Sequence, residues 1–527
     1  MKVLVSDNLS PQGIEILKGA KGVEVDVRSG LSPEELRAII GNYHGLAVRS
    51  ATKVTADIIE VATNLKVIGR AGVGVDNIDV ESATKNGIVV MNTPGGNSMA
   101  AAQHTIALML AIAREIPQAT ASMREKRWEK KRFLGMEIFG KTLGVIGLGN
   151  IGGVVAERGL GMKMHVIVYD PYISPDLASQ KGVELVSLDE LFARSDIITI
   201  HVPKSKETEH LINAKTIKKM KDGVMLVNCA RGGIVDEKAL AEACRSGKIR
   251  AAAFDVFSQE PPPPDNPLLD VENIVCTPHL GASTSEAQEN VAIAIAQQMV
   301  DYLTEGTIIN AVNVPSVDAQ VLATLGPYLN LGQRMGGFFA QTCPFPLKEL
   351  IINYQGEVTA YNVAPISSTI LVGILSSYMD EHVNEINAPF IAKERGINFR
   401  ESKITETADF TSLITLSAKA TNATHVVAGT LFGKKEPRLS MVNDYFVEAV
   451  PTGNILLVDT SDRPGVIGNI GTTLGARDIN IGNMQFGRNK IGGKSLCILH
   501  LDTIPSTDIL DELARLPHVN SVRLIQL

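Results

Sequence analysis

The first 310 residues alternate between short apolar runs and amphipathic stretches. Ten runs rich in β-branched residues, among them MKVLVSD, TLGVIGL, MHVIVYD and VMLVNCA, are separated by helical sequences such as SPEELRAII and DEKALAEACRSG. Buried strands that alternate with helices predict parallel, doubly wound sheets. Because ten strands in this length require two sheets, we expect an α/β protein with two such domains in this part of the chain.

The sequence NTPGGNSMAAAQHTIALMLAIARE marks the crossing between the two sheets. A Pro-Gly-Gly turn precedes an Ala-rich helix that passes from one sheet to the other. We predict a first, flavodoxin-like domain at residues 1–97 and a second, Rossmann-like domain at residues 98–285. A helix expected at residues 283–304 returns to the first domain, which therefore also takes residues 286–311.

The rest of the sequence predicts two further domains. NAVNVPSVDAQ has the composition of a linker, and a helix-rich and then strand-rich region follows it. We therefore expect an α+β intervening domain at residues 314–450. Residues 453–527 run as strand, helix, two strands, helix and strand, which predicts a ferredoxin-like βαββαβ domain.

Composition excludes several kinds of partner. The net charge of -7 gives no electrostatic footprint for nucleic acid, and no run reaches the roughly 18 uncharged apolar residues of a membrane helix. The opening MKVLVSD lacks the apolar segment of a signal peptide. The five cysteines are scattered, and the ten histidines show no paired ligand spacing. We therefore expect a cytoplasmic protein without a metal site, a nucleic acid partner or a membrane partner.

The tetrapeptide GNIG occurs twice, and its first copy completes a GxGxxG motif directly after the strand TLGVIG. Gly147 allows the tight turn, Gly149 lets the backbone approach a pyrophosphate, and Gly152 lets the following helix pack on the strand. The next strand ends at Asp170, whose carboxylate would hold ribose hydroxyls and repel a 2′-phosphate. The sequence therefore predicts a site for NAD rather than NADP. The alternative is a glycine-lined turn beside a solvated aspartate.

Three polar residues follow later strands, namely Arg231 in NCARGG, Glu260 in FSQEPPP and His279 in CTPHLG. The ends of strands in such sheets face the ligand crevice. Oxidation of an alcohol by hydride transfer needs a base, a group that tunes the base, and a cation for the carboxylate. We assign these roles to His279, Glu260 and Arg231, respectively. Taken singly, the three residues also have structural interpretations as a loop histidine, a solvated turn and a strand cap.

Basic residues and a glycine-rich turn in the first domain indicate an acidic substrate. Arg49 and Ser50 end one strand, and Arg70 ends another. The turn AGVGVDN, which includes Gly72 and Val73, offers backbone N–H groups that can hold a carboxylate.

The second domain carries the sequence KKR, whose Lys131 and Arg132 we expect to lie opposite the first cluster. A substrate with both a phosphate and a carboxylate would use both clusters. A solvated basic helix end is the competing interpretation.

The second GNIG copy, at residues 468–471, fails as a nucleotide loop. Arg463-Pro464-Gly465 stands before it, so no GxG pattern precedes its last glycine, and no acidic strand end follows at the right distance. Pro464 suits the first turn of a helix, which places Gly468 and Gly471 inside that helix.

Several motifs, in this order and spacing, resemble the D-isomer-specific 2-hydroxyacid dehydrogenases: GLGNIG, NCARGGIVDE, AFDVFSQEP and TPHLGAST. RSATKVT, GRAGVGVDNID and MNTPGGNS resemble the long-form phosphoglycerate dehydrogenase branch, and the C-terminal segment resembles an ACT domain. The resemblance implies that Arg231, Glu260 and His279 are the catalytic set. It also implies an NAD site lined by Asn150, Ile151, Asp170, Val202, Cys229, Ala230, Asp255, Gly281 and Ala282.

For this branch the resemblance implies oxidation of 3-phospho-D-glycerate to 3-phosphohydroxypyruvate, the first committed step of L-serine synthesis. It further implies a homo-oligomer, a dimer or a tetramer, whose ACT domains bind L-serine through Asp462 and Asn480 at an interface between copies. Thr460 and Asp462 depart from the histidine and the asparagine that some relatives carry at these positions.

Other functions stay open at this point. Another D-2-hydroxyacid, such as glycerate or 2-hydroxyglutarate, would fit the same catalytic set. An NAD-sensing, corepressor-like binding protein would keep the dehydrogenase domains. Such relatives end in disordered tails, whereas the last two regions of this sequence have the strand and helix patterns of globular domains. A pure amino-acid sensor would leave the catalytic set without a use.

Overall fold

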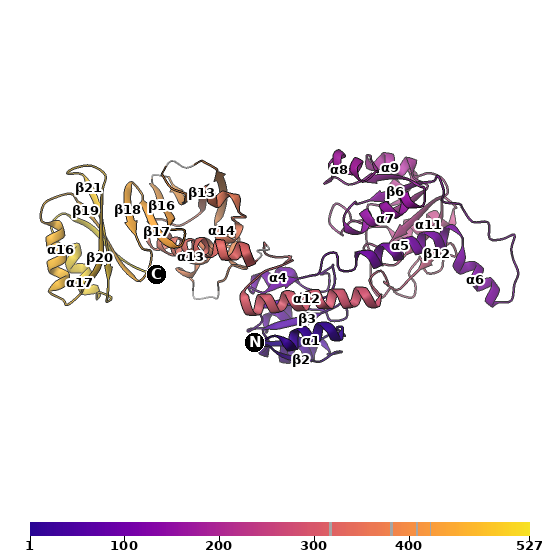
Figure 1. Ribbon diagram of the computed structural model, residues 1–527, viewed down its shortest axis with the longest axis horizontal. Coiled ribbons are helices and arrows are strands. Elements are labelled where there is room, and N and C mark those ends of the chain that lie inside the picture. Colours follow the sequence, from indigo (N-terminus) through magenta and orange to yellow (C-terminus); the bar gives the residue numbers. More distant parts are fainter. Residues whose placement is uncertain (316–318, 380–382, 407–408, 422) are drawn as a thin grey trace.

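The computed structural model describes residues 1–315, 319–379, 383–406, 409–421 and 423–527. Figure 1 shows four bodies along its longest axis, with the second domain at one end and the C-terminal domain at the other. The first domain lies between the second and the intervening domain. Two parallel sheets, one mixed sheet and one antiparallel sheet form these bodies, so the predicted α/β fold class is confirmed.

The first domain is a five-stranded parallel sheet in the order β2-β1-β3-β4-β5. Helix α12 returns to this sheet and packs so closely that a side chain at Gly69 would collide with Met299. The strands are β1 (Lys2–Val5), β2 (Glu24–Val27), β3 (Gly45–Val48), β4 (Val67–Arg70) and β5 (Val89–Met91), and the helices are α1 (Pro11–Gly19), α2 (Pro33–Ile39), the 3-10 helix η1 (Ile40–Asn42), α3 (Ala56–Glu60), α4 (Val80–Lys85) and α12 (Ser285–Glu305).

The second domain is a seven-stranded parallel sheet in the order β12-β11-β10-β9-β6-β7-β8. The Ala-rich helix α5 packs on α7, β10 and β11, as expected of a segment that crosses into this domain. The strands are β6 (Thr142–Ile146), β7 (His165–Tyr169), β8 (Glu184–Leu185), β9 (Ile197–Ile200), β10 (Val224–Asn228), β11 (Ile249–Phe254) and β12 (Ile274–Cys276), and the helices are α5 (Ser98–Ala113), α6 (Ile116–Arg124), α7 (Asn150–Gly161), α8 (Pro175–Gln180), α9 (Leu188–Arg194), α10 (Ala214–Lys218) and α11 (Glu237–Arg245).

The intervening domain is a six-stranded mixed sheet in the order β14-β13-β15-β16-β17-β18. Helices α13 and α14 pack together at Gly336 and Gly373, where a side chain would collide with the other helix's backbone. The strands are β13 (Glu349–Gly356), β14 (Asn398–Ile404), β15 (Ser412–Ala420), β16 (Ala423–Phe432), β17 (Glu436–Val442) and β18 (Tyr445–Ala449), and the helices are α13 (Ala319–Thr342), the 3-10 helix η2 (Glu357–Ala360), α14 (Ala364–Ser376) and α15 (Ala388–Glu394).

The C-terminal domain has the predicted βαββαβ order and an antiparallel sheet in the order β20-β21-β19-β22. Its elements are β19 (Asn454–Ser461), α16 (Val466–Gly475), β20 (Ile481–Arg488), β21 (Lys494–Leu501), α17 (Thr507–Ala514) and β22 (Val519–Gln526). Gly468 and Gly471 lie inside α16 as predicted. The prediction for Pro464 was wrong by two residues, because Gly465 adopts a left-handed φ of 90° and the helix begins only after it.

In the two parallel sheets, two strands escaped the prediction from sequence. β2 and β8 are outer strands of their sheets, and their sequences EVDV and EL are largely exposed and partly acidic. Such strands lack the continuous apolar run that identified the others. In the described part of the chain, no helix is both long and apolar enough to span a membrane.

Candidate active site

The turn between β6 and α7 forms a cradle at the N-terminus of a helix. Gly147 adopts a φ of 93°, which favours glycine, and α7 begins at Asn150. A side chain at Gly152 would collide with the carbonyl of Gly147, whereas a Cβ at Gly149 would meet no atom within 4 Å. The helix N-terminus therefore faces open space that suits a pyrophosphate, since free backbone N–H groups and the helix dipole favour anions there.

Asp170 lies at the end of β7, beside this cradle. Its Oδ2 accepts a hydrogen bond from the backbone N–H of Leu148 at 2.8 Å, and its Oδ1 accepts one from Tyr172 at 2.9 Å. The carboxylate is thus fixed at the rim of the glycine turn, where a ribose that follows the pyrophosphate would meet it. Cradle and carboxylate together fit an NAD molecule.

The other residues expected around NAD lie along the ends of neighbouring strands. Val202 follows β9 and lies against Gly147. Cys229 and Ala230 follow β10 and are buried, and burial raises the pKa of the Cys229 thiol to about 12. Gly281 and Ala282 belong to the loop after β12. The thiol of Cys229 stays protonated at neutral pH, so it contributes apolar surface rather than a nucleophile.

His279 and Glu260 form a hydrogen-bonded pair. Nδ1 of His279 lies 2.6 Å from Oε2 of Glu260, whose Oε1 accepts a hydrogen bond from the backbone N–H of Phe257 at 3.0 Å. Partial burial acts to raise the pKa of Glu260, but the bonds from His279 and Phe257 and the charges of His279 and Arg231 outweigh it and lower that pKa. The carboxylate faces Nδ1 of the imidazole, so Nε2 is the ring nitrogen left to exchange a proton with a substrate.

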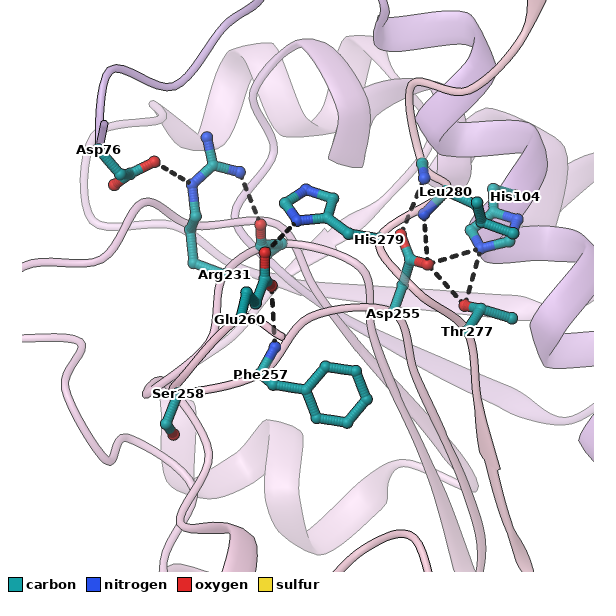
Figure 2. A network of polar contacts seen from close by, with 12 residues as sticks. Asp76, His104, Arg231, Asp255, Phe257, Ser258, Glu260, Thr277, His279 and Leu280 are labelled. Carbon is teal, nitrogen blue, oxygen red and sulfur yellow. Dashed lines mark hydrogen bonds and ion pairs between the residues drawn. The ribbon is translucent and has the colours of Figure 1, made fainter. Parts of the chain in front are cut away.

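Arg231 follows β10 and lies beside the same carboxylate, as Figure 2 shows. Its Nε donates to Oδ2 of Asp76 at 3.1 Å, and one terminal nitrogen, NH1, donates to the carbonyl of Ala230 at 2.7 Å. Asp76 belongs to the glycine-rich turn of the first domain. The Arg231–Asp76 ion pair therefore links the two α/β domains across the cleft between them.

Asp255 anchors the loop that carries His279. Its fully buried carboxylate accepts hydrogen bonds from the N–H groups of Leu280 and Gly281 at 2.7 and 2.8 Å and from the hydroxyl of Thr277 at 2.6 Å. Nε2 of His104, on α5, lies 3.2 Å from the same carboxylate. His279 has a left-handed φ of 56°, which is unfavourable for a residue with a side chain. The bonds to the two following amides hold the backbone in this conformation.

A cavity of about 510 Å³ joins the His279–Glu260 pair to the first domain. Arg70 lies on its wall, and burial, followed by the charge of Arg231, lowers the pKa of Arg70 to about 10. Arg70 therefore stays cationic at neutral pH. The cavity is lined among others by Ser50, Lys53, Arg70, Asp76, Glu260 and His279, so it combines an imidazole with two cations, Lys53 and Arg70.

Arg49, Gly72 and Val73 lie around this cavity and are held by side chains on neighbouring loops. The backbone N–H of Arg49 donates to Asp7 at 2.6 Å, and its carbonyl accepts from Asn77 at 2.8 Å. Gly72 packs against the guanidinium of Arg70, and the carbonyl of Val73 accepts from Asn92. The glycine-rich turn is thereby fixed next to Arg70.

Sequence reasoning missed five residues of this region. Asp7 ends the first strand, Lys53 belongs to RSATKVT, and Asp76 and Asn77 belong to the AGVGVDN turn, so the motifs already singled out contained a signal for these four. His104 lies on a helix and carried no such signal, since its partner is far away in the sequence.

Lys131 and Arg132 do not meet the catalytic pair in this chain. Arg132 forms ion pairs with Glu129 and Glu272 and lines another cavity, together with Arg250. Lys131 is exposed on the segment after α6, which projects from the end of the second domain (Figure 1). Any contact between these cations and the cavity at His279 would have to come from a second copy.

The two expected effector residues lie at opposite ends of α16. Asp462, before the helix, accepts a hydrogen bond from the N–H of Gly492 at 2.9 Å, and Asn480, after the helix, donates to Asp502 at 2.7 Å. A helix of 10 residues separates such positions by about 15 Å. One copy of the domain therefore does not bring them together. Among the described residues, no group of three or more His, Cys, Asp or Glu side chains is arranged to hold a metal ion.

Comparison with known proteins gives three family matches. Residues 106–281 match the NAD binding domain of D-isomer specific 2-hydroxyacid dehydrogenases, residues 324–443 the D-3-phosphoglycerate dehydrogenase intervening domain, and residues 454–518 the ACT domain. The D-3-phosphoglycerate dehydrogenase of Archaeoglobus fulgidus is 44% identical over 529 residues, covering 100% of both chains. That of Bacillus subtilis is 39% identical, covering 100% of this chain and 99% of its own. The solved D-lactate dehydrogenase of Aquifex aeolicus, in complex with NAD and lactic acid, superposes with a TM-score of 0.54 at 30% identity, covering 60% of this chain and 100% of that one.

The parallel sheets, the glycine cradle and the histidine–carboxylate pair define an NAD-dependent oxidoreductase of the D-isomer-specific 2-hydroxyacid dehydrogenase class. The family and the cofactor expected from the motifs are thereby confirmed. Within this class, the chain belongs to the D-3-phosphoglycerate dehydrogenase family.

Proposed function

We propose that this chain oxidises 3-phospho-D-glycerate to 3-phosphohydroxypyruvate, the first committed step of L-serine synthesis. The observation that carries this proposal is the cavity in which the His279–Glu260 pair meets Arg70, because it offers a base and a cation to one acidic hydroxyacid. The names of the full-length relatives support the same substrate.

The catalytic residues divide the work as their contacts indicate. Glu260 holds Nδ1 of His279, so Nε2 is the nitrogen that takes the proton from the C2 hydroxyl. The neighbouring carboxylate stabilises the imidazolium that results. Arg231 holds the substrate carboxylate, together with backbone N–H groups of the turn at Gly72 and Val73. The turn at Gly147 and Gly149 and the carboxylate of Asp170 would hold NAD, which would supply the acceptor for the hydride on C2.

The phosphate would be held by cations of the first domain. Arg70 and Lys53 line the cavity, and Arg49 and Ser50 lie at the end of the neighbouring strand β3. Lys131 and Arg132 would join them from a second copy, since they lie elsewhere in their own chain.

A direct test follows the appearance of NADH when 3-phosphoglycerate is added to the full chain and NAD. We expect turnover, and we expect His279→Ala to abolish it while NAD binding, measured by calorimetry, stays intact. Absence of turnover by the unaltered chain, with NAD bound, would favour a corepressor-like NAD sensor instead.

We further propose that the chain forms a homo-oligomer, a dimer or a tetramer, and that L-serine regulates it through the ACT domain. The separation of Asp462 and Asn480 supports this view, because two copies side by side would bring one residue from each to a shared site. Trp128, Leu134 and Phe139 are 80%, 81% and 67% exposed on the segment after α6, and such apolar groups are typical of a surface covered by a partner. Serine titration above and below the concentration at which the oligomer dissociates tests the idea. Undiminished binding by the monomer would contradict it.

We also propose a cytoplasmic location and a division into four domains. The cysteines Cys229, Cys244, Cys276, Cys343 and Cys497 are all free, which supports a reducing compartment. The proposed division has a substrate-binding domain at 1–97 and 286–311, an NAD-binding domain at 98–285, an intervening regulatory domain at 314–450 and an ACT domain at 453–527. Limited proteolysis at the junctions tests these boundaries.

A further inference from the structure

Two of the five N–H donors of Arg231 bond to other residues of the chain. Nε donates to Asp76 and NH1 donates to the carbonyl of Ala230. A carboxylate held by two parallel bonds needs either Nε with one terminal nitrogen or both terminal nitrogens. Asp76 occupies Nε, so a substrate carboxylate can bind Arg231 through Nε and one terminal nitrogen only if it displaces Asp76.

The turn that carries Asp76 also closes on the third nitrogen, NH2. A side chain at Gly74 would collide with NH2 of Arg231 and with Oδ2 of Asp76, so the backbone of the turn lies directly against the guanidinium. This turn is the one whose N–H groups are proposed to hold the substrate carboxylate. The position between the turn and Arg231 is therefore filled by the chain itself.

Asp76 is also suited to this place by its charge. Burial and then the charge of Arg231 lower the pKa of Arg70, and the charge of Asp76 acts in the opposite direction. The side chain of Asp76 is 70% exposed and that of Arg231 is 30% exposed, so this ion pair is accessible to solvent and weak enough to exchange. Figure 2 shows Asp76 on one side of Arg231 and His279 on the other.

We propose that Asp76 is an internal competitor for the carboxylate site: it occupies Arg231 in the substrate-free chain and is displaced when the substrate carboxylate binds. This inference rests on the proposed function to the extent that Arg231 is the carboxylate ligand. It assigns Asp76 to a second role as well, because the same displacement breaks the ion pair between the two α/β domains. Substrate binding and the relative position of these domains are then coupled through one carboxylate exchange.

The test uses oxamate, a small unreactive carboxylate without a phosphate, titrated into the full chain saturated with NADH. Asp76→Asn is expected to lower the Kd of oxamate about threefold to fivefold, the range that loss of an exposed ion pair allows. Asp79→Asn is the matched control. Asp79 lies at the same cavity and loses the same charge, but its carboxylate caps α4 through Ser82, a bond that asparagine can also make.

Three outcomes decide the matter. A tighter Kd for Asp76→Asn with less than a twofold change for Asp79→Asn supports the competitor role. A weaker or unchanged Kd for Asp76→Asn overturns it, because Asp76 would then orient Arg231 or be without effect. An equal fall in the Kd of oxamate in both variants also overturns the proposal. The cause would then be the loss of a negative charge anywhere at the cavity. Oxamate binding is measured without turnover, so failure of 3-phosphoglycerate oxidation remains a separate result.

Discussion

Nδ1 of His279 and Oε2 of Glu260 lie 2.6 Å apart, and the two residues come from different loops at the same edge of the seven-stranded sheet. His279 follows β12, and Glu260 follows β11, its immediate neighbour in the sheet. Parallel strands end at a common edge, so strand order alone brings these loops together. The pair is thus a consequence of topology, refined by the bond from Phe257 to Glu260.

Replacing Glu260 with Gln is expected to lower kcat on the order of 100-fold, since the imidazolium loses its neighbouring charge. The KM for NAD should stay within about twofold of its original value, because the bonds of Glu260 go to His279 and Phe257 and not to the glycine cradle. Gln259→Ala, an exposed change on the same loop, serves as the control. Steady-state kinetics on both variants checks the expectation, and equal kcat values would remove Glu260 from the mechanism.

The same carboxylate predicts a dependence of stability on pH. The pKa of Glu260 is lower in the folded chain than its ordinary value of 4.5. Its ionised form therefore adds stability above that value, and this contribution is lost as the pH falls through the lower folded pKa. We expect the difference in Tm between the unaltered chain and Glu260→Gln to be largest near neutral pH and to shrink below about pH 4.5. A difference that grows on acidification would contradict the assignment.

Asp255→Asn should loosen the loop that holds His279. An amide group presents a donor to at least one of the donors now facing the buried carboxylate, which costs about 1–3 kcal/mol. We expect a lower Tm and a kcat reduced by about tenfold or more, because the strained backbone at His279 loses its support. Thr277→Val removes a single bond to the same carboxylate and should have the smaller effect. The idea fails if the two variants are equally active.

Asp170→Ala is expected to relax the preference for NAD over NADP. The change removes the negative charge at the rim of the glycine cradle, where a 2′-phosphate would lie. The ratio of kcat/KM for the two cofactors should fall by about tenfold or more. Ser174→Ala, which removes a nearby helix cap, should leave this ratio alone. An unchanged ratio in Asp170→Ala would count against the cofactor assignment.

The sequence predicted those parts of the molecule that depend on local patterns. The buried strands, the glycine cradle at Gly147 and the polar strand ends at Arg231 and His279 all follow from residues close together in the chain. Asp76 and His104 were missed because their roles arise from partners about 150 residues or more away. Lys131 and Arg132 were expected near the substrate, but in their own chain Arg132 pairs with Glu272 and Lys131 is exposed. The outer strands β2 and β8 were missed because exposed edge strands lack an apolar run.

Closeness in the sequence was also a poor guide to which residues share a site. Asp462 and Asn480 share one small domain, yet α16 separates them, so sequence proximity did not imply a common site. Arg70 and His279 come from different domains, yet the return of α12 and the crossing of α5 place them on one cavity.

Arg70→Gln tests the source of phosphate affinity. We expect the KM for 3-phosphoglycerate to rise by about tenfold or more, because a partly buried cation on the cavity wall is lost. The KM for D-glycerate should change far less. Lys66→Gln alters a cation of the same domain that lines other cavities and provides the control. A parallel rise for both substrates would show that Arg70 does not select the phosphate.

The most direct test of the whole account is a comparison of kcat/KM for 3-phospho-D-glycerate and D-glycerate with the unaltered full chain and NAD. A site with cations built to hold a phosphate should favour the phosphorylated substrate by about 100-fold or more, since binding groups left unpaired by the smaller substrate are costly. Equal values for the two substrates would contradict the account and would point to another D-2-hydroxyacid as the substrate.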